Sequence, residues 1–413
     1  MAALHAVEST TKWVVSQLRA VDRNDTLTVG KAACCRTTGW RNPFIVKTAS
    51  LRVSLGIGIL QITIACALLA ASRHEPRPGA MTALADKQQS VAAEFPFIDV
   101  HTHLDPTDTE GSVGRAVWAV RAENAVGVLF LPPPLPPDSK NPYDYEVLRS
   151  VPSGQGGELA FLGGGGTLNV MIQQSARDEL VTPELMKKFR AQAEEILHEG
   201  AVGFGEMAAE HFATAAGTYY EYAPPDHPLF LLLADISAEH GGIPIDLHME
   251  AVPHVMKLPD GFTSPPNPPQ LHPNIAGFER LLEHNRGARI VWAHAGWDNT
   301  GFRTPELMRR LLGAHPNLYM EIKIDPAAPG KNSPLEDGGA GAIKPQWLRL
   351  FQDFSDRFVI GSDQHYPEPA ATVQRWQPVV LLLNQLPPYL RRKIGRDNPV
   401  RIYHLVGAAA ANN

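Results

Sequence analysis

Two histidines one residue apart carry the first chemical signal in this sequence. They end an apolar stretch that begins at Phe97 and leads to His101 and His103. Residues i and i+2 of a β-strand point to the same side, so a strand here would place both imidazoles on one face. Imidazole is a common ligand of transition metals. The chain has 16 histidines, so this pair alone is a weak signal, and the case depends on how later strands end.

Composition restricts the kind of metal site that is available. The three cysteines are Cys34, Cys35 and Cys66, and the chain after them has none. That part of the chain therefore has no disulfide, thiol nucleophile or cysteine-ligated zinc, and His, Asp and Glu must hold any metal. The net charge of -6 gives no general attraction to nucleic acid or acidic membrane surfaces, and a small-molecule substrate is the expected partner.

The elements that must position these residues alternate between strands and helices from Phe95 onward. Strands are expected near 97–103, 125–131, 159–162, 201–207, 243–249, 289–293, 317–324 and 357–360. Helices are expected over 183–198, 229–240, 274–284, 305–314 and 345–354. Alternation of this kind indicates an α/β fold with parallel strands. Eight such units predict a (β/α)8 TIM barrel, whose active site lies at the carboxyl ends of the strands.

Five of the expected strands end in a residue that can bind metal. The candidate ligands are His101, His103, Glu206, His248, His294 and Asp363. A single core histidine is usually bonded to a backbone carbonyl, but five strand ends that converge on one barrel mouth favour a metal site. Imidazole and carboxylate together suit Zn²⁺ best, and also Mn²⁺ or Fe²⁺. A bound divalent ion lowers the pKa of a water molecule towards about 7.

The order His-x-His, Glu, His, His, Asp resembles the amidohydrolase superfamily of metal-dependent hydrolases. Ile98 to His103 is similar to the opening of its amidohydrolase-related branch, which includes hydrolases and non-oxidative decarboxylases of aromatic acids. Residues 386–403 are similar to the helices that close barrels of this branch, and the resemblance covers 95 to about 407. It implies that Asp363 is both metal ligand and general base. It also implies that His294 binds a second metal or orients water or substrate.

Glu206 departs from the familiar two-metal members, which have a carboxylated lysine on the fourth strand. A Gly-Glu pattern at this place is similar to TatD-type deoxyribonucleases. Glu206 would either bridge two metals or support a ligand from outside, and the branch leaves one or two ions open. Glu250 follows His248 by two residues and is interpreted as a solvated carboxylate at the rim, in preference to a support for His248. Trp297 and Asp298 are expected to form part of the same rim.

The expected activity is hydrolysis of a small amide, ester or lactone. The alternative is a metal-dependent lyase that decarboxylates an aromatic or unsaturated acid, and a barrel that only binds its ligand is the third reading. A decarboxylase must hold a carboxylate with a fixed cation. The candidate cations are Arg115, Lys140, Lys257, Arg303 and Lys323. None directly adjoins a candidate ligand in sequence, so the hydrolase is preferred, while Lys323 near the mouth keeps the lyase open.

Residues 1–80 form an N-terminal extension unlike the catalytic domain predicted for 81–413. A positive flank precedes an apolar segment from Val53 to Ala71, which has the parts of a secretory signal and is long enough for a membrane anchor. The sequence therefore predicts an exported or membrane-anchored protein. The long extension before such a segment is unusual, and a true start near Leu51 or Val53 would place the apolar segment at the N-terminus. If the N-terminal extension as a whole is a mis-called start, the protein would be cytoplasmic.

Overall fold

The computed structural model describes residues 93, 95–105, 107–139, 142–151, 159–214, 219–324, 335, 342–366 and 376–405. The N-terminal extension, with its apolar segment 53–71, lies outside these residues, as does Lys140. Within the described part of the chain, no helix has both the length and the apolar character needed to cross a membrane.

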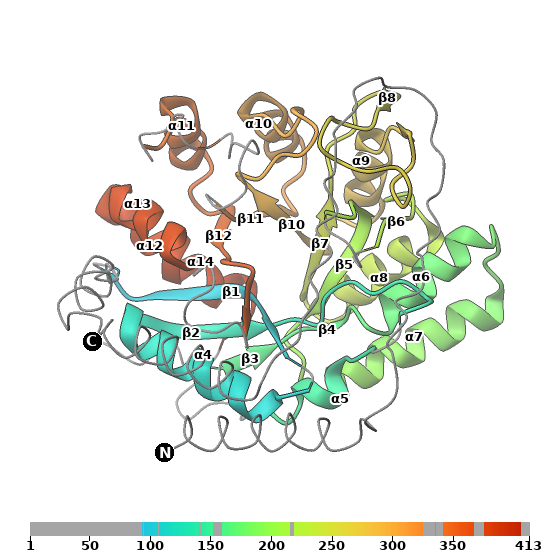
Figure 1. The fold of residues 1–413 in the computed structure, drawn as a ribbon, viewed down its shortest axis with the longest axis horizontal. Helices are drawn as coiled ribbons and strands as arrows, with labels where there is room; N and C mark the ends of the chain where they lie inside the picture. Colours follow the sequence, from blue (N-terminus) through green and yellow to red (C-terminus); the bar gives the residue numbers. More distant parts are fainter. Residues whose placement is uncertain are drawn as a thin grey trace, which may run out of the picture. The chain divides into compact units, whose positions relative to one another are not determined.

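Parallel strands lie at the centre of the described residues and form two sheets (Figure 1). The strands are β1 (Phe97–Leu104), β2 (Ala125–Phe130), β3 (Leu159–Phe161), β4 (Gly163–Gly164), β5 (Phe204–His211), β7 (Pro244–Met249), β10 (Arg289–Ala295), β11 (Leu318–Ile322), β12 (Phe358–Ile360) and β13 (Gln364–Tyr366). One sheet has the order β13-β1-β2-β3 and the other β12-β11-β10-β7-β5-β4. Only Leu162 separates β3 from β4, and only residues 361–363 separate β12 from β13. The two sheets therefore join at both edges, which confirms the predicted (β/α)8 barrel.

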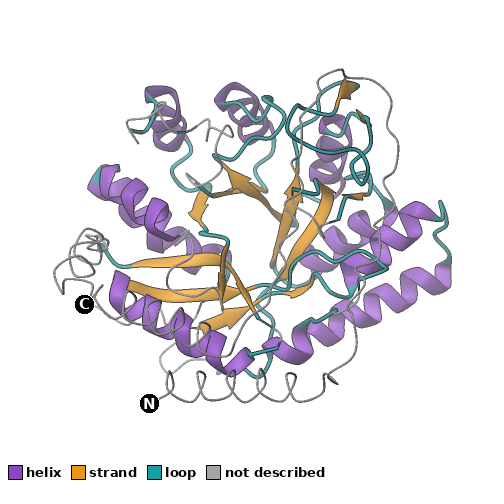
Figure 2. Cartoon of the chain, in the orientation of Figure 1, coloured by secondary structure: helices purple, strands orange, loops and turns teal. Residues whose placement is uncertain are grey.

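Helices surround the ring of strands (Figure 2). They are α4 (Thr109–Glu123), α5 (Tyr145–Leu148), α6 (Leu168–Arg177), α7 (Pro183–His198), α8 (Pro228–Glu239), α9 (Ile275–His284), α10 (Pro305–Ala314), α11 (Pro345–Asp353), α12 (Trp376–Gln385), α13 (Pro388–Arg392), the π-helix η1 (Lys393–Asp397) and α14 (Asn398–Ile402). Sequence signals fix α7 and α10 most sharply, because each begins with Pro directly after a threonine. Thr182 and Thr304 accept backbone N–H groups of the first turn, as N-cap residues do.

Short antiparallel strands lie beyond the carboxyl ends of two barrel strands, β5 and β7. β6 (Glu221–Tyr222) pairs with the end of β5. β8 (Met256–Lys257) pairs with β9 (Gln270–Leu271) inside the proline-rich segment that follows β7. These pairings give structure to segments that the sequence pattern alone would leave as loops.

The apolar core has two layers. The larger layer lies between strands and helices and includes Trp292 and Trp347. The smaller layer combines strand residues such as Ile98 and Val291 with Tyr403 and its neighbours at the end of the chain. The C-terminal segment therefore closes the amino-terminal end of the barrel, as the resemblance implied, and the opposite end is left for the site.

One predicted strand end, that of β5, is wrong, while β12 ends at Ile360 as predicted. β5 continues past Glu206 to His211 because it also pairs with β6, so Glu206 is the third residue of its strand. The last strand is interrupted at Asp363, whose backbone φ of 52° lies in the left-handed region. A β-bulge between Asp99 and Thr102 shifts the register of β1, and such a bulge re-aims the side chains that follow it.

Asp144 ties the segment after β2 to the turn after β4, and its loss should destabilise the barrel. This buried carboxylate accepts hydrogen bonds from the backbone N–H groups of Gly164 and Gly166 and from the Thr167 hydroxyl. Asp144→Ala would leave these donors without their acceptor, at a cost of roughly 1–3 kcal/mol. Urea unfolding measures it, and Asp108→Ala, which removes an exposed partner of Arg115, should change the midpoint little. Equal midpoints for the two variants would contradict this role.

Candidate metal centre

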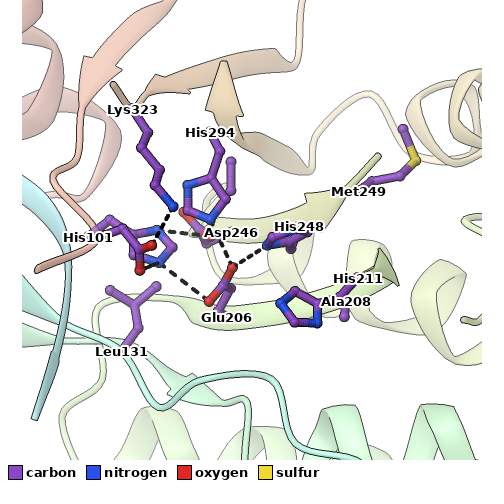
Figure 3. Close-up of polar contacts among 12 residues, drawn as sticks. His101, Leu131, Glu206, Ala208, His211, Asp246, His248, Met249, His294 and Lys323 are labelled. Atoms are coloured by element: carbon purple, nitrogen blue, oxygen red, sulfur yellow. Dashed lines mark hydrogen bonds and ion pairs between the residues drawn. The ribbon is translucent and has the colours of Figure 1, made fainter. Parts of the chain in front are cut away.

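Glu206 lies between four imidazoles at the barrel mouth, and Figure 3 shows it with three of them, His101, His248 and His294. Its Oε2 is 3.4 Å from His101 Nε2 and 3.7 Å from His103 Nε2. Its Oε1 is 2.8 Å from His248 Nδ1 and 3.2 Å from His294 Nε2. Each carboxylate oxygen thus faces one pair of histidines.

Asp363 completes the group of six predicted side chains. Its Oδ1 is 3.0 Å from His103 Nε2 and 4.0 Å from His101 Nε2. Its Oδ2 accepts a hydrogen bond of 2.5 Å from Lys323 Nζ. His365 Nε2 lies 3.6 Å from Oδ1 on a half-exposed ring. The structure therefore brings all six candidates together, five of them buried and His248 nearly so.

The donor set fits a divalent metal ion. Three groups of three side chains, built around Glu206 or Asp363, have ligand atoms within 4.8 Å of one another. These groups are His101, His103 and Glu206; His248, His294 and Glu206; and His103, His365 and Asp363. Both ring nitrogens of buried His101 lack a hydrogen-bond partner within the described residues. Buried polar atoms are normally satisfied, and an ion on the inner nitrogen would satisfy this one.

Left-handed backbone occurs at both residues for which the sequence predicted a catalytic role. φ is 63° at His294 and 52° at Asp363, a conformation that costs roughly 1–3 kcal/mol for residues with a side chain. The His294 N–H donates to Glu321 Oε2 at 2.7 Å, and its carbonyl accepts from Arg303 at 2.6 Å. The surrounding structure thus holds strained backbone where the site needs it.

Burial and charge act against each other in the pKa values of the centre. Burial alone would lower the pKa of His101, but the carboxylates of Glu206 and Asp246 outweigh it and raise this pKa well above its usual value. The pKa of His248 rises to about 9 against its burial, because Glu206 and Glu250 stabilise the charged ring. Without metal, protons therefore supply part of the positive charge that the buried carboxylates require.

Lys323 and the histidines lower the pKa values of the two acids, Glu206 and Asp363, against the effect of burial. Burial would raise the pKa of Glu206, but His101 and the other imidazoles hold it well below its usual value. Burial would likewise raise the pKa of Asp363, but Lys323 and His103 hold it well below its usual value. Both carboxylates are therefore ionised at neutral pH.

Two corrections concern groups at the rim. Glu250 is buried, not solvated as predicted, because Asn299 donates to its Oε1 and His248 lies 3.8 Å away. Arg303 is also buried, and it donates to the carbonyls of Met249, Ala293 and His294. Arg303 therefore binds the carboxyl ends of β7 and β10 and is not placed to hold a substrate.

The predicted rim residues Trp297 and Asp298 have distinct roles. The Trp297 ring lies 4.8 Å from Lys323 Nζ, close enough for a cation–π contact. The Asp298 carboxylate accepts backbone N–H groups of the loop that leads to Arg303. Trp297 thus borders the site, and Asp298 shapes the loop behind it.

Sequence reasoning missed two fully buried carboxylates beside the histidines. Asp246 Oδ1 is 3.6 Å from His101 Nδ1, and Glu321 Oε2 is 3.1 Å from His294 Nδ1. A signal was present, because Asp246 precedes His248 by two residues and Glu321 precedes Lys323 by two. Side chains two apart on a strand share a face, so these carboxylates had to point into the same barrel interior.

Comparison with known proteins identifies the family. A family model described as "Amidohydrolase" matches residues 180–405, more than half of the chain. A search of curated proteins found no match. Among solved structures, a 2,6-dihydroxybenzoate decarboxylase from Rhizobium is 11% identical, with 75% of this chain and 99% of that chain covered and a TM-score of 0.41. A zinc-bound amidohydrolase from Burkholderia multivorans is 12% identical, with the same coverage and a TM-score of 0.39.

The barrel, the group of histidines and carboxylates at its mouth, and the extent of the family match lead to one conclusion. The chain belongs to the amidohydrolase family of metal-dependent enzymes.

Proposed function

We propose that this protein is a metal-dependent hydrolase of a small amide, ester or lactone. The observation that carries the proposal is the position of Glu206, with one pair of histidines at each carboxylate oxygen. A carboxylate so placed can bridge two ions, one on each side. If only one ion binds, Glu206 would bind that ion together with one pair of histidines and would hydrogen-bond to the other pair.

The six side chains divide into two sets around Glu206. One set consists of His101, His103 and Asp363, and the other of His248 and His294. A divalent ion bound here would supply Lewis acidity that activates water and polarises the substrate carbonyl. Nitrogen and oxygen donors of this kind suit Zn²⁺. The proteins of this family are metal-dependent, and the residues here offer only nitrogen and oxygen donors.

Asp363 is the proposed general base. Its Oδ1 faces the imidazoles and is the atom that takes a proton from water and returns it to the leaving group. Lys323 holds Oδ2, which fixes the orientation of the carboxylate and keeps it ionised before the proton arrives. His294 is the second proposed catalytic residue, with Nε2 turned towards Glu206 and Nδ1 towards Glu321.

Hydrolysis is preferred because two cations that could serve a decarboxylase have other partners. Arg303 is bonded to backbone carbonyls, and Lys323 is paired with Asp363. A hydrolase needs no additional cation. Decarboxylation remains the second candidate, because Lys323 lies beside the site and could exchange Asp363 for a substrate carboxylate.

A substrate panel separates the two activities. Purified protein with added Zn²⁺ or Mn²⁺ is assayed on simple lactones, esters and amides and on hydroxybenzoate-type acids. We expect turnover of an acyl substrate and a loss of at least 100-fold in Asp363→Asn, because the proposed base is removed. Release of carbon dioxide from the acids, without turnover of any acyl substrate, would reverse the ranking.

Metal stoichiometry tests the role of Glu206. If Glu206 bridges two ions, Glu206→Ala should halve the metal bound per chain and nearly abolish turnover. Elemental analysis of the purified variant measures this. Glu210→Gln is the matched control, because this buried carboxylate on the same strand bonds to Tyr220 and Asn274. Unchanged metal content in Glu206→Ala would show that Glu206 lies outside the coordination sphere.

The raised pKa of His248 predicts how metal binding depends on pH. A metal competes with the proton on this ring, so affinity should increase as the pH rises from 6 to about 9. The stability of the metal-free protein should instead fall as the pH rises. The proton on the His248 ring stabilises the folded protein fully below pH 6.5, and this stabilisation is lost as the pH rises through about 9.

Metal titrations and thermal unfolding across pH 6 to 9 measure the two trends. His248→Asn is the variant that removes the titrating ring, and it should flatten the pH dependence of the metal-free stability. Metal affinity independent of pH over this range would contradict the prediction.

A further inference from the structure

Each of the four central imidazoles has an acceptor on the side away from Glu206. For His103 it is a backbone carbonyl, since Nδ1 lies 2.9 Å from the Leu131 oxygen. For the other three rings it is a carboxylate. The pairs are His101 Nδ1 with Asp246 Oδ1 at 3.6 Å, His294 Nδ1 with Glu321 Oε2 at 3.1 Å, and His248 Nε2 with Glu250 Oε1 at 3.8 Å.

These three carboxylates are buried, and each has at least one oxygen without a hydrogen-bond partner within the described residues. Both oxygens of Asp246 lack a hydrogen-bond partner within the described residues. One oxygen of Glu321 and one of Glu250 are in the same state. A buried carboxylate needs positive charge or donors nearby. The His101 ring can supply them to Asp246. The rings of His294 and His248 add to the donors that Glu321 and Glu250 already have, the His294 backbone N–H and the Asn299 side chain.

We propose that Asp246, Glu250 and Glu321 are positioning residues that set the tautomers of the metal-binding histidines. A negative charge on the outer side of a ring favours the N–H there and leaves the lone pair of the inner nitrogen facing Glu206. This inference rests on the proposed function, in which the inner nitrogens bind metal. At 3.6 and 3.8 Å, the Asp246 and Glu250 contacts are electrostatic. Glu321 lies 3.1 Å from His294 Nδ1, but this nitrogen makes no hydrogen bond of good geometry within the described residues, so this contact is electrostatic too.

Asp246 offers the cleanest test of the three. Glu321 also accepts the backbone N–H of His294, and Glu250 also accepts from Asn299, so their loss would disturb more than a tautomer. Among the described residues, His101 is the one imidazole that is paired with Asp246. Asp246→Asn keeps the shape and one acceptor oxygen but removes the charge, and Asp246→Leu removes both.

Zinc affinity of the metal-stripped full-length protein, measured by competition with a chromophoric chelator, is the first readout. We expect Asp246→Asn to weaken zinc binding about 10-fold and Asp246→Leu nearer 100-fold, the range typical of groups that support a ligand. Glu210→Gln, which changes a buried carboxylate that accepts hydrogen bonds from Tyr220 and Asn274, should bind zinc as the wild type does. Equal affinity in wild type and both Asp246 variants, or an equal loss in Glu210→Gln, would overturn the inference.

If two ions bind, the variants should separate them. Asp246→Asn should weaken the ion that shares Glu206 Oε2 with His101, and Glu250→Gln should weaken the ion at His248. Loss of the same ion in both variants would count against the assignment. A wild-type protein that binds no zinc would instead refute the proposed function, so the two failures are distinguishable.

The tautomers themselves give a readout that does not require any variant to fold. In zinc-loaded wild-type protein with ¹⁵N-labelled histidine, long-range proton–nitrogen spectra should place the protons of His101 and His294 on Nδ1. His101, His294 and Glu321 could also hold an ion among themselves, which would occupy Nδ1 and leave the protons on Nε2. Protonated Nε2 on these rings would overturn the inference.

Discussion

A carboxylate buried among four imidazoles is the interaction on which this structure depends. Moving an ionised carboxylate out of water costs several kcal/mol even after relaxation, and Glu206 is almost fully buried. The cost is offset only if β1, β7 and β10 bring their histidines to it together. The closed ring of strands does this, because each strand places a ring at the same end of the barrel.

The backbone around the site is fixed from outside the barrel mouth. Arg303 donates to the last carbonyl of β7, at Met249, and to the His294 carbonyl near the end of β10, and Glu321 accepts from the N–H of His294. On the far side, Asp99 accepts from the Ser362 N–H and hydroxyl, next to the left-handed Asp363. A Cβ at Gly361 would lie 2.3 Å from a Glu321 oxygen, so this glycine gives the buried carboxylate its space. Buried charged groups thus hold the left-handed backbone at the two proposed catalytic residues, His294 and Asp363.

Much of this arrangement could be predicted from sequence, for a definite physical reason. Parallel strands in a barrel end on one side, so residue types at strand ends predict which side chains converge, and the six candidates do. Helices α7 and α10 have the predicted bounds because Thr-Pro is a strong local start signal.

Other features depend on tertiary contacts that local patterns do not contain. The end of β5 depends on its pairing with β6. The break at Asp363 depends on a left-handed residue. The burial of Arg303 and Glu250 depends on how a loop folds back over two strand ends. Asp246 and Glu321 are different, because the two-residue period of their strands pointed to them and that signal was overlooked.

The two sides of Glu206 differ in their surroundings. In the proposed reaction, one side would hold an ion and the other would carry out the proton transfer. On the His248 side, Glu250 and Arg303 are buried and bonded to the protein, so that side is suited to hold an ion in place. On the other side, Asp363 lies next to Lys323 and to the half-exposed ring of His365. The Asp363 side therefore combines the ionised base with a lysine and a half-exposed imidazole, while the opposite side supplies fixed charge.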